Sequence, residues 1–196
     1  MIDLFELGSE FFEGLTAIDL SIVEQAARQP CSECGGRLYR GDYPRKPRGG
    51  QIAGAAEGWV RRFSLCCGSE GCRRRATPPS VRFLGRRVYV GAVVIMAAAV
   101  ALTSMAASAA VRATGVPSRT TRRWLRWWRG SFTTSRPFVE LSARMVPPPE
   151  RRWLPTSLLE RFAAGRSAAV LKLLSWLAPI STTSCLQGWS FVRAAM

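Results

Sequence analysis

Two groups of cysteines, separated by a basic stretch rich in glycine and proline, are the residues best suited to chemistry. Cys31 and Cys34 form a C-x2-C pair followed directly by two glycines, small residues that suit a tight metal-binding turn. The second group reads CCGSEGC, in which four residues separate Cys67 and Cys72. Thiolates at these spacings are typical of tetrahedral zinc sites, and four of them leave no open position for water. The spacing therefore predicts a four-cysteine Zn²⁺ site that is structural and not catalytic.

The second group holds three cysteines, so one of them must lie outside the predicted ligand set. Adjacent residues in a strand point to opposite sides, so Cys66 and Cys67 cannot easily bind the same ion. We predict Cys67 as the ligand, because its spacing to Cys72 is the more usual one, with Cys66 as the substitute. Reduced structural cysteines, a redox pair and an iron–sulfur cluster are the alternatives to zinc.

The cellular compartment decides how the six cysteines are interpreted. The N-terminus is acidic where a secretory signal would be basic, so we expect a cytoplasmic protein with reduced thiols. The sequence contains no histidine, which excludes mixed Cys/His metal sites and catalysis by a histidine acid or base. Metal binding is therefore favoured over disulfide bonds.

The net charge is strongly positive and unevenly distributed along the chain. The formal charge is +15, and all 28 basic residues except Lys46 and Lys172 are arginines. Residues 1–30 are acidic instead, so the basic charge belongs to the rest of the chain and the acidic part could fold back on it. Such a charge suits a polyanion, and we expect a nucleoid-associated protein that binds nucleic acid.

A basic arm lies between the two cysteine groups, and three arginines follow the second group directly. Arms of this kind contact phosphate groups or enter a minor groove, whereas a solvated loop is the alternative. The predicted nucleic-acid contacts in this part are Arg45, Lys46, Arg48, Arg73, Arg74 and Arg75.

Residues 104–130 have the pattern of a helix-turn-helix. A first helix of small residues is followed by Gly115, where the chain must turn, and by Val116, an apolar residue that can plug the turn. Ser118 is the predicted N-cap of a second helix that runs to about Arg129. The preceding cysteine-rich module strengthens the interpretation as a DNA-binding unit.

The second helix of this motif has two chemically different faces. Trp124, Trp127 and Trp128 are spaced i, i+3 and i+4, so they share one face that can pack on the preceding helix. Arginines occupy another face, where the first residues of such a helix reach base edges and later ones hold phosphates. An arginine-rich helix that packs only within its own domain is the alternative. The predicted DNA contacts are Ser118, Arg119, Thr120, Arg122, Arg123 and Arg126, with Arg119, Thr120 and Arg123 as the expected base readers.

The elements that position these residues follow from composition and hydrophobic spacing. Thr16 or Asp19 is a predicted cap of an N-terminal helix that Pro30 ends. The cysteine-rich part is too poor in apolar residues to fold without a metal staple. The predicted fold class is mainly α with a small β zinc ribbon, followed by a helix-turn-helix and C-terminal helices. The predicted regions are 1–30, an acidic helical segment; 31–80, the four-cysteine zinc ribbon with its basic arm; 81–145, the helix-turn-helix domain; and 146–196, an amphipathic helical region with a loose tail.

Residues 88–111 carry no charge and are long enough to span a bilayer. The segment is rich in alanine, serine and threonine and lacks an asymmetric charged flank, so its drive to insert is weak. We therefore expect a closely packed helix within the protein and consider a membrane partner unlikely. A protein with a single membrane span remains an alternative.

The carboxylates after the helix-turn-helix do not form a convincing active site. Phosphoryl transfer on DNA requires two metal ions held by well-separated carboxylates. Glu140, Glu150 and Glu160 lie on a stretch that prolines interrupt, with no predicted sheet to hold them. We therefore expect that the protein is not an enzyme.

The order of these motifs resembles a known family. CSEC, a basic loop, RFSLCC with GCRRR, a helix and then ATGVPSRTTRRWLRWW are similar to zinc-ribbon helix-turn-helix proteins of bacterial insertion sequences and to N-terminal portions of transposases. The resemblance covers residues 31–130, with Cys72 at the end of the ribbon and Gly115 in the turn. It implies a mobile-element protein that binds double-stranded DNA as a transcriptional regulator or a transposition accessory.

The resemblance also suggests partners and leaves one further alternative. The amphipathic helix in 146–196 is expected to contact a transposase or a second copy of the chain, or else to pack within its own chain. An RNA-binding zinc-ribbon protein is the alternative to a DNA-binding one, and a preference for single strands would favour it.

Overall fold

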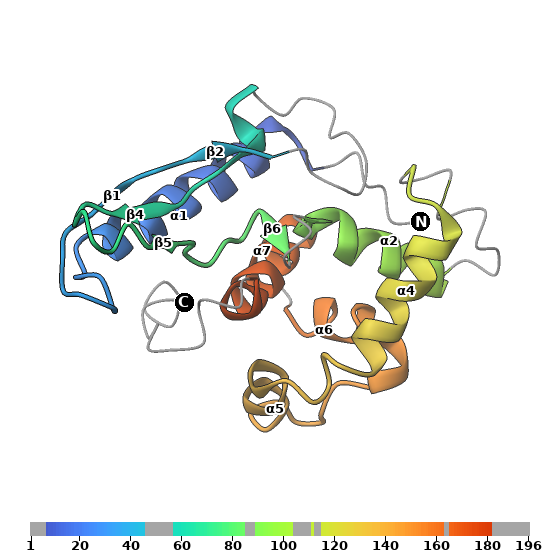
Figure 1. Ribbon diagram of the computed structural model, residues 1–196. Helices are drawn as coiled ribbons and strands as arrows, with labels where there is room; N and C mark the ends of the chain where they lie inside the picture. Colours follow the sequence, from blue (N-terminus) through green and yellow to red (C-terminus); the bar gives the residue numbers. More distant parts are fainter. Residues whose placement is uncertain are drawn as a thin grey trace.

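The computed structural model describes residues 7–45, 57–84, 89–103, 111, 115–162 and 165–181 (Figure 1). Helices dominate this part of the chain, and short strands form three small antiparallel sheets, as a mainly α fold with a small ribbon requires. The helices and 3-10 turns are α1 (Ser9–Ala27), η2 (Glu57–Val60), α2 (Gly91–Thr103), α4 (Ser118–Arg129), α5 (Arg136–Ser142), η3 (Arg151–Trp153), α6 (Thr156–Leu159), α7 (Arg166–Leu177) and η4 (Ala178–Ile180). The strands are β1 (Leu38–Arg40), β2 (Tyr43–Pro44), β3 (Arg61–Arg62), β4 (Leu65–Cys67), β5 (Arg75–Ala76), β6 (Phe83–Leu84) and β7 (Tyr89–Val90).

The N-terminal helix α1 runs without a break from Ser9 to Ala27. The prediction that Thr16 or Asp19 caps a helix was wrong, because both residues lie inside this one. The hydroxyl of Thr16 donates to the carbonyl of Phe12, one turn earlier, at 2.9 Å. Asp19 is buried, and its carboxylate has partners outside the helix.

Helix α1 packs against two hydrophobic cores. Phe12 and Leu15, in its first half, belong to the large core of the helical part. Val23 and Ala26, in its second half, pack with Leu65 in a smaller core beneath the ribbon. With 19 residues the helix is about 28 Å long, so it spans both parts of the molecule. The acidic segment is therefore a structural component that joins the ribbon to the helical part.

The ribbon is a three-stranded sheet in the order β1-β4-β5. Leu38 and Cys67 are directly opposite one another and buried on the face toward α1. Tyr39, Cys66 and Arg75 are aligned across the three strands and lie on the other face. The pleat of the sheet thus separates a buried apolar face from an outer face.

Strands β1 and β2 belong to one extended segment, and β2 pairs with β3 in the same register as β1 pairs with β4. Tyr39 pairs with Cys66 in β1 and β4, and Tyr43 pairs with Arg62 in β2 and β3. Between them the amide of Gly41 donates to the carbonyl of Ser64 at 2.9 Å. Figure 1 shows β1 and β2 end to end along one edge of the fold. Every second residue from 37 to 45 therefore projects on the same side.

The helical part is built around α2, which is buried on nearly all sides from Ala92 to Val100. It packs against α4 and α7, which flank it in Figure 1. The approach of α7 is so close that a Cβ on Gly91 would lie 2.5 Å from a methyl carbon of Leu174. Within the described ranges, no helix has both the length and the apolar character needed to cross a membrane.

Helix α7 is the amphipathic helix predicted in 146–196, and its apolar face lies within the chain. Val170, Leu173, Leu174 and Leu177 are buried in the large core, partly against α2. This is the intramolecular packing predicted from the sequence as the alternative to binding a partner. Residues 104–110 and 112–114, which include most of the predicted first helix of the helix-turn-helix, lie outside the described residues.

A buried ion pair joins α1 to the segment that leads into the helical part. The Arg82 Nε donates to the Asp19 carboxylate at 2.8 Å, and both side chains are at most 1% exposed. The same carboxylate accepts from the hydroxyl of Ser80 at 2.5 Å and from the amide of Val81 at 2.7 Å. A buried ion pair needs such additional hydrogen bonds, because without them the free-energy cost of removing both charges from water exceeds their mutual attraction.

The two terminal nitrogens of the Arg82 guanidinium also donate hydrogen bonds. They donate to the carbonyls of Trp59 and Arg61, each at 3.0 Å. The guanidinium carbon lies 4.4 Å from the centre of the Phe63 ring, within the range of a cation–π interaction. Arg82 therefore ties α1, η2 and β3 to the start of β6, and one member of the acidic segment does contact the basic part of the chain.

Candidate metal centre

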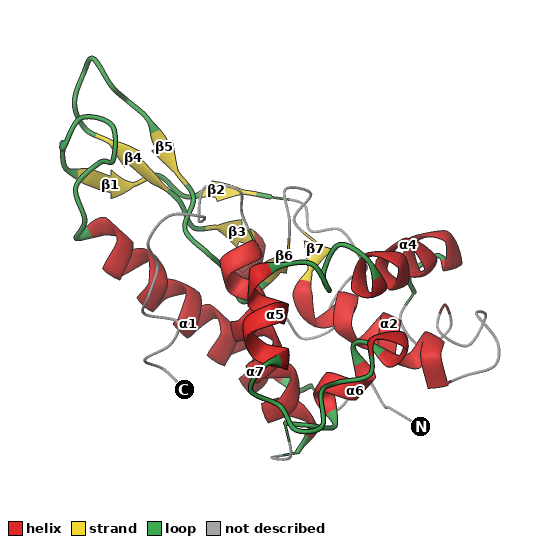
Figure 2. Ribbon diagram, turned by 90° about the horizontal axis from the view of Figure 1, so that it is seen from below, coloured by secondary structure: helices red, strands yellow, loops and turns green. Residues whose placement is uncertain are grey.

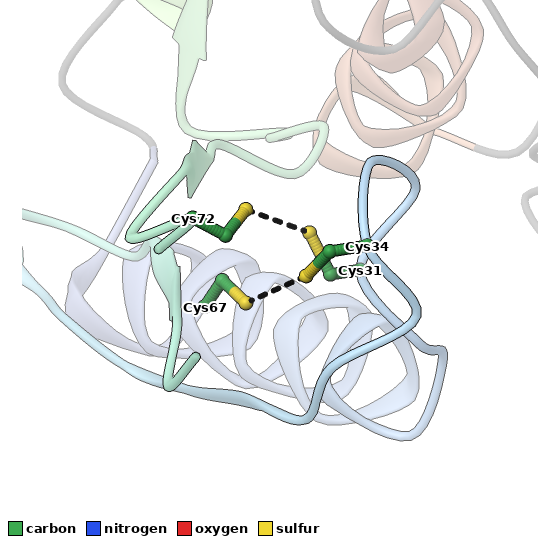
Figure 3. Close-up of side chains that lie close together, drawn as sticks. All are labelled: Cys31, Cys34, Cys67 and Cys72. Atoms are coloured by element: carbon green, nitrogen blue, oxygen red, sulfur yellow. Dashed lines mark hydrogen bonds between the residues drawn. The ribbon is translucent and has the colours of Figure 1, made fainter. Parts of the chain in front are cut away.

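Four cysteine sulfurs converge between two loops, as Figure 3 shows. Cys31 and Cys34 come from the loop between α1 and β1, whereas Cys67 and Cys72 come from the end of β4 and the loop after it. All four Sγ atoms lie within 4.8 Å of one another. The Cys34 and Cys67 sulfurs are 3.4 Å apart, and those of Cys31 and Cys72 are 3.8 Å apart. The four predicted cysteines thus form a cluster that could bind a metal ion.

The geometry and chemistry of the cluster fit a tetrahedral ion. With metal–sulfur distances of about 2.3 Å, the sulfurs of a regular tetrahedral site lie roughly 3.8 Å apart. The Cys34–Cys67 and Cys31–Cys72 distances, 3.4 and 3.8 Å, lie near this value, and every pair of sulfurs lies within 4.8 Å. The donors are all soft thiols, and four of them would complete a tetrahedral coordination shell without a water molecule.

Two glycines shape the first loop. Gly35 has φ +72°, a left-handed conformation that favours glycine, and its amide donates to the Cys31 carbonyl at 2.8 Å. A Cβ on Gly36 would lie 3.1 Å from the Cys67 sulfur and 3.3 Å from the Cys34 sulfur. The backbone at Gly36 therefore passes directly beneath the sulfurs, and a side chain there would intrude on them.

The second loop is held by backbone hydrogen bonds. The amides of Cys72 and Arg73 both donate to the Ser69 carbonyl, at 3.0 and 3.1 Å. Arg73 has φ +46°, an unusual conformation for a residue with a side chain, where the turn closes. The amide of Gly68 donates to the Arg37 carbonyl at 3.0 Å and so links this loop to the first one. These backbone hydrogen bonds position the two loops relative to one another.

The thiols influence one another's ionisation. The Gly36 amide, aided by neighbouring thiols and the Ser69 hydroxyl, lowers the pKa of Cys34 to about 6. The Arg74 amide acts to lower the pKa of Cys72, but the Cys34 sulfur and burial outweigh it and raise this pKa to about 12. Neighbouring thiolates repel one another, so the cluster resists a second negative charge in the absence of a cation. A divalent cation would remove that penalty.

Cys66 lies outside the cluster. Its Sγ lies 3.5 Å from the Arg73 carbonyl oxygen and 3.7 Å from that of Cys67. Because adjacent residues of β4 project to opposite sides, Cys67 faces the other sulfurs and Cys66 does not. The cluster therefore contains Cys67, as predicted, and not Cys66. Cys185 lies outside the described residues.

The predicted basic contacts of the ribbon are only partly described. Arg45 and Arg73 are exposed to solvent. The guanidinium of Arg45 lies 5.5 Å from the centre of the Tyr43 ring. Lys46 and Arg48 lie outside the described residues.

Arg74 and Arg75, the last two predicted contacts of the ribbon, both have partners within it. Arg74 forms an exposed ion pair with Glu33 at 3.0 Å. Arg75 donates to the Gly41 carbonyl at 2.7 Å and to the Ser64 hydroxyl at 2.9 Å. These bonds hold the Arg75 side chain against the outer face of the sheet.

The turn before α4 has the predicted form, but the cap differs. Gly115 has φ +64°, which the predicted sharp turn requires, and Val116 is buried. The prediction of Ser118 as the N-cap was wrong, because Pro117 takes this position and Ser118 is the first helical residue. Pro117 is extended and its carbonyl accepts the first helical hydrogen bond, from the amide of Thr121 at 3.1 Å, and no side chain caps the free amides of the first turn.

The two faces of α4 are separated as the sequence predicts. Trp124 and Trp128 are buried in the large core, and Trp127 is partly buried against it. Thr120 is partly exposed. Arg123 donates to the hydroxyl of Tyr89, and its guanidinium lies 5.5 Å from that ring's centre. The exposed residues of the other face are Arg119, Arg122, Arg123, Arg126 and Arg129.

The metal cluster and α4 lie far apart in the molecule. Both views show the loops beyond β1, β4 and β5 at one end and α4 at the other (Figures 1 and 2). Helix α4 packs against α2 and also contacts η3, and the pairing of a helix-turn-helix is not seen within the described part of the chain. The ribbon and α4 therefore present basic residues on separate parts of the surface.

A row of side chains lies on the outer face of the ribbon: Arg37, Tyr39, Tyr43 and Arg45, together with Arg75 from β5. Arg45 and Arg75 are predicted nucleic-acid contacts, whereas the sequence predictions missed the other three. The recurrence of arginine and tyrosine at every second or fourth position was the available signal. We call these five residues the arginine–tyrosine row.

Comparisons with protein-family models, with curated proteins and with solved structures give no match to this chain. The candidate functions of the metal cluster, of α4 and of the arginine–tyrosine row accordingly follow from their geometry, exposure and charge.

Proposed function

We propose that this chain is a non-catalytic DNA-binding protein whose ribbon is held together by a structural zinc ion. The observation that carries the proposal is the division of α4 into a buried tryptophan face and an exposed arginine face. A helix anchored in this way can enter the major groove without giving up its packing on the core. The exposed face adds positive charge where the DNA phosphates lie.

The roles along α4 follow from position in the helix. Arg119, Thr120 and Arg123, in its first half, would contact base edges, because residues near the start of a recognition helix reach deepest into the groove. Arg122 and Arg126 would contact phosphates and so contribute affinity for any sequence. The α4 sequence contains no acidic residue that would oppose these contacts.

Zinc would act as a staple of the ribbon. Cys31, Cys34, Cys67 and Cys72 would hold the ion, and the tetrahedral set of thiolates would cross-link both loops. The core beneath the ribbon is small, so a metal supplies folding energy that apolar burial alone does not. This support would keep the basic residues of the ribbon in place.

The biological setting belongs to the same proposal. The order of a four-cysteine ribbon and an arginine-rich helix resembles proteins of mobile genetic elements, so we assign the chain to transposition or to regulation of such an element. A transposase or a second copy of the chain would be its protein partner. The motif order supports this assignment, and the predicted absence of catalysis agrees with a purely binding role.

Duplex binding by matched arginine variants tests the proposal. The test variant carries Arg119→Ala and Arg122→Ala in α4, and the control carries Arg144→Ala and Arg161→Ala, which removes two exposed arginines elsewhere. Affinity for labelled duplex DNA is measured by fluorescence anisotropy over a salt series. We expect the α4 variant to lose affinity and about one unit of salt-dependence slope, because Arg122 is the phosphate contact of the two and each lost phosphate contact removes about one unit.

Two outcomes would contradict the proposal. Equal affinity of the α4 variant and the wild type for duplex DNA would remove the recognition role of this helix. Equal losses in the test and control variants would show that net charge alone, and not the α4 face, drives binding.

A further inference from the structure

One ring of the arginine–tyrosine row, that of Tyr39, is exposed to solvent. Tyr39 is 52% exposed, although it is a large aromatic residue in the middle of a strand. Its ring rests on the backbone of Gly68, where a Cβ would lie 2.5 Å from the ring atom Cε2. The guanidinium of Arg37 lies 5.4 Å from the ring centre. The ring is therefore held in position while much of its surface meets solvent.

Two guanidiniums lie close to the second ring of the row. The guanidinium carbons of Arg75 and Arg45 lie 5.2 and 5.5 Å from the centre of the Tyr43 ring. Arg75 is fixed by its bonds to the Gly41 carbonyl and the Ser64 hydroxyl. Cation–π contacts of this kind orient both the ring and the charge.

The spacing along the strand places a guanidinium between the two rings. Tyr39 and Tyr43 are four residues apart on one continuous register, so they lie about 13 Å apart along the strand. Gly41, midway between them on the same side, contributes no side chain, and Arg75 donates to its carbonyl at 2.7 Å. The row therefore alternates ring and guanidinium surfaces.

The charge of the row is positive and not cancelled by the nearest carboxylates. Its three arginines are all exposed. Asp42 forms an ion pair with Arg40, which does not belong to the row. Glu33 pairs with Arg74, which lies outside the row.

We infer that the arginine–tyrosine row is a binding surface for single-stranded nucleic acid. Nucleic-acid bases stack on exposed rings, and guanidiniums bind the phosphates or stack on the bases themselves. A duplex keeps its base faces covered, so the rings select strands whose bases are unpaired. The surface lies at the other end of the molecule from α4 and binds independently of the duplex contacts proposed there (Figures 1 and 2).

The main test combines ring variants with oligonucleotides that have or lack bases. Labelled oligomers of about twelve nucleotides, made as thymidine DNA, as uridine RNA and as an abasic DNA backbone, are titrated by fluorescence anisotropy. The protein carries Arg119→Ala and Arg122→Ala, so that α4 contributes little. Tyr39→Ala with Tyr43→Ala removes both rings of the row, and Tyr39→Phe with Tyr43→Phe keeps them.

Trp153→Ala provides the matched control. Trp153 is 44% exposed and lies beside the guanidinium of Arg152, at 5.7 Å, in η3. It is therefore a ring–guanidinium pair of the same type outside the ribbon. Metal content of every variant, measured by elemental analysis, identifies any change that has disturbed the ribbon itself.

We expect the double alanine variant to bind the base-bearing strands more weakly by about fivefold to a hundredfold for each ring removed, which is the contribution of one base stacked on an aromatic ring. The phenylalanine variant and Trp153→Ala should bind as the parent protein does. The abasic strand should bind the parent protein more weakly than the base-bearing strands. The DNA and RNA oligomers then show which kind of single strand binds more tightly.

Two outcomes would overturn the inference. The first is unchanged affinity for base-bearing strands after both rings are removed. The second is equal binding of abasic and base-bearing strands by the parent protein, a comparison that needs no ring variant and so does not depend on how the variants fold. Neither result affects the duplex test on α4, so the two surfaces are judged separately.

Discussion

Replacing Asp19 by asparagine removes the negative charge that neutralises Arg82 without changing the size of the side chain. The two side chains are 1% and 0% exposed, so water cannot replace the lost carboxylate. The amide of asparagine keeps an acceptor for the Val81 amide or the Ser80 hydroxyl. It leaves the guanidinium of Arg82 buried and unneutralised.

The expected loss of stability is large because the pair is fully buried. Removing one partner of a buried, hydrogen-bonded ion pair typically costs about 3–5 kcal/mol. A domain of this kind is stable by about 5–15 kcal/mol, so the variant should lose a large part of its stability. The same change in the exposed pair between Glu150 and Arg152, at 61% and 76% exposure, should cost about 0–1 kcal/mol.

Urea unfolding followed by tryptophan fluorescence measures these free energies. Trp59, whose carbonyl accepts from Arg82, lies beside the pair and reports on it. Asp19→Asn, Arg82→Met and the double variant form a cycle at fixed zinc concentration, with Glu150→Gln as the exposed control. The double variant should cost less than the sum of the single ones, because it leaves no unpaired buried charge.

A loss of unfolding free energy below about 1 kcal/mol in Asp19→Asn would refute the reasoning, since leaving a guanidinium buried and unpaired should destabilise the fold by more than this. Strict additivity in the cycle would also refute it, because it would show that the two side chains do not stabilise one another.

The remaining predictions concern the metal cluster. Cys34→Ser should abolish binding of one zinc ion per chain, whereas Cys66→Ser should leave it intact, because the Cys66 thiol faces away; elemental analysis of the purified proteins distinguishes them. A full zinc content in Cys34→Ser would contradict the ligand set. Gly36→Ala should weaken zinc binding about tenfold or more in a chelator competition, because its Cβ would lie 2.2 Å from the Ser69 hydroxyl and 3.1 Å from the Cys67 sulfur. Gly14→Ala, where nothing lies within 4 Å, should leave zinc affinity unchanged, and equal effects of the two alanines would refute the steric argument.

Several features of the fold and of the candidate site could be predicted because they depend on residues close in sequence. The spacing of the cysteines and the pleat of a strand are enough to choose Cys67 over Cys66. The helical period places Trp124 and Trp128 on one face, which is buried as predicted. The turn at Gly115 follows from the conformations open to glycine. The predicted N-cap, Ser118, is wrong by one residue, because Pro117 occupies the N-cap position.

Other features could not be predicted because they depend on residues far apart in the chain. Asp19 was interpreted as a helix cap, yet its partners Ser80 and Arg82 are more than sixty residues away. The arginine–tyrosine row forms only because β1 and β2 keep one register against β4 and β3. Composition shows an excess of arginine but does not show which arginines lie together on a surface.

The sequence by itself determined the chemistry that is available: four thiols at metal-binding spacing, a helix with tryptophan and arginine faces, and a large positive charge. The tertiary structure alone decided where each charge lies. Arg82 is buried against Asp19, whereas Arg126 faces solvent, although both are arginines beside apolar neighbours in the sequence. Local spacing determines which face of an element a residue occupies, but its burial depends on what packs against that face. A charge can remain buried only where a distant segment supplies its partner.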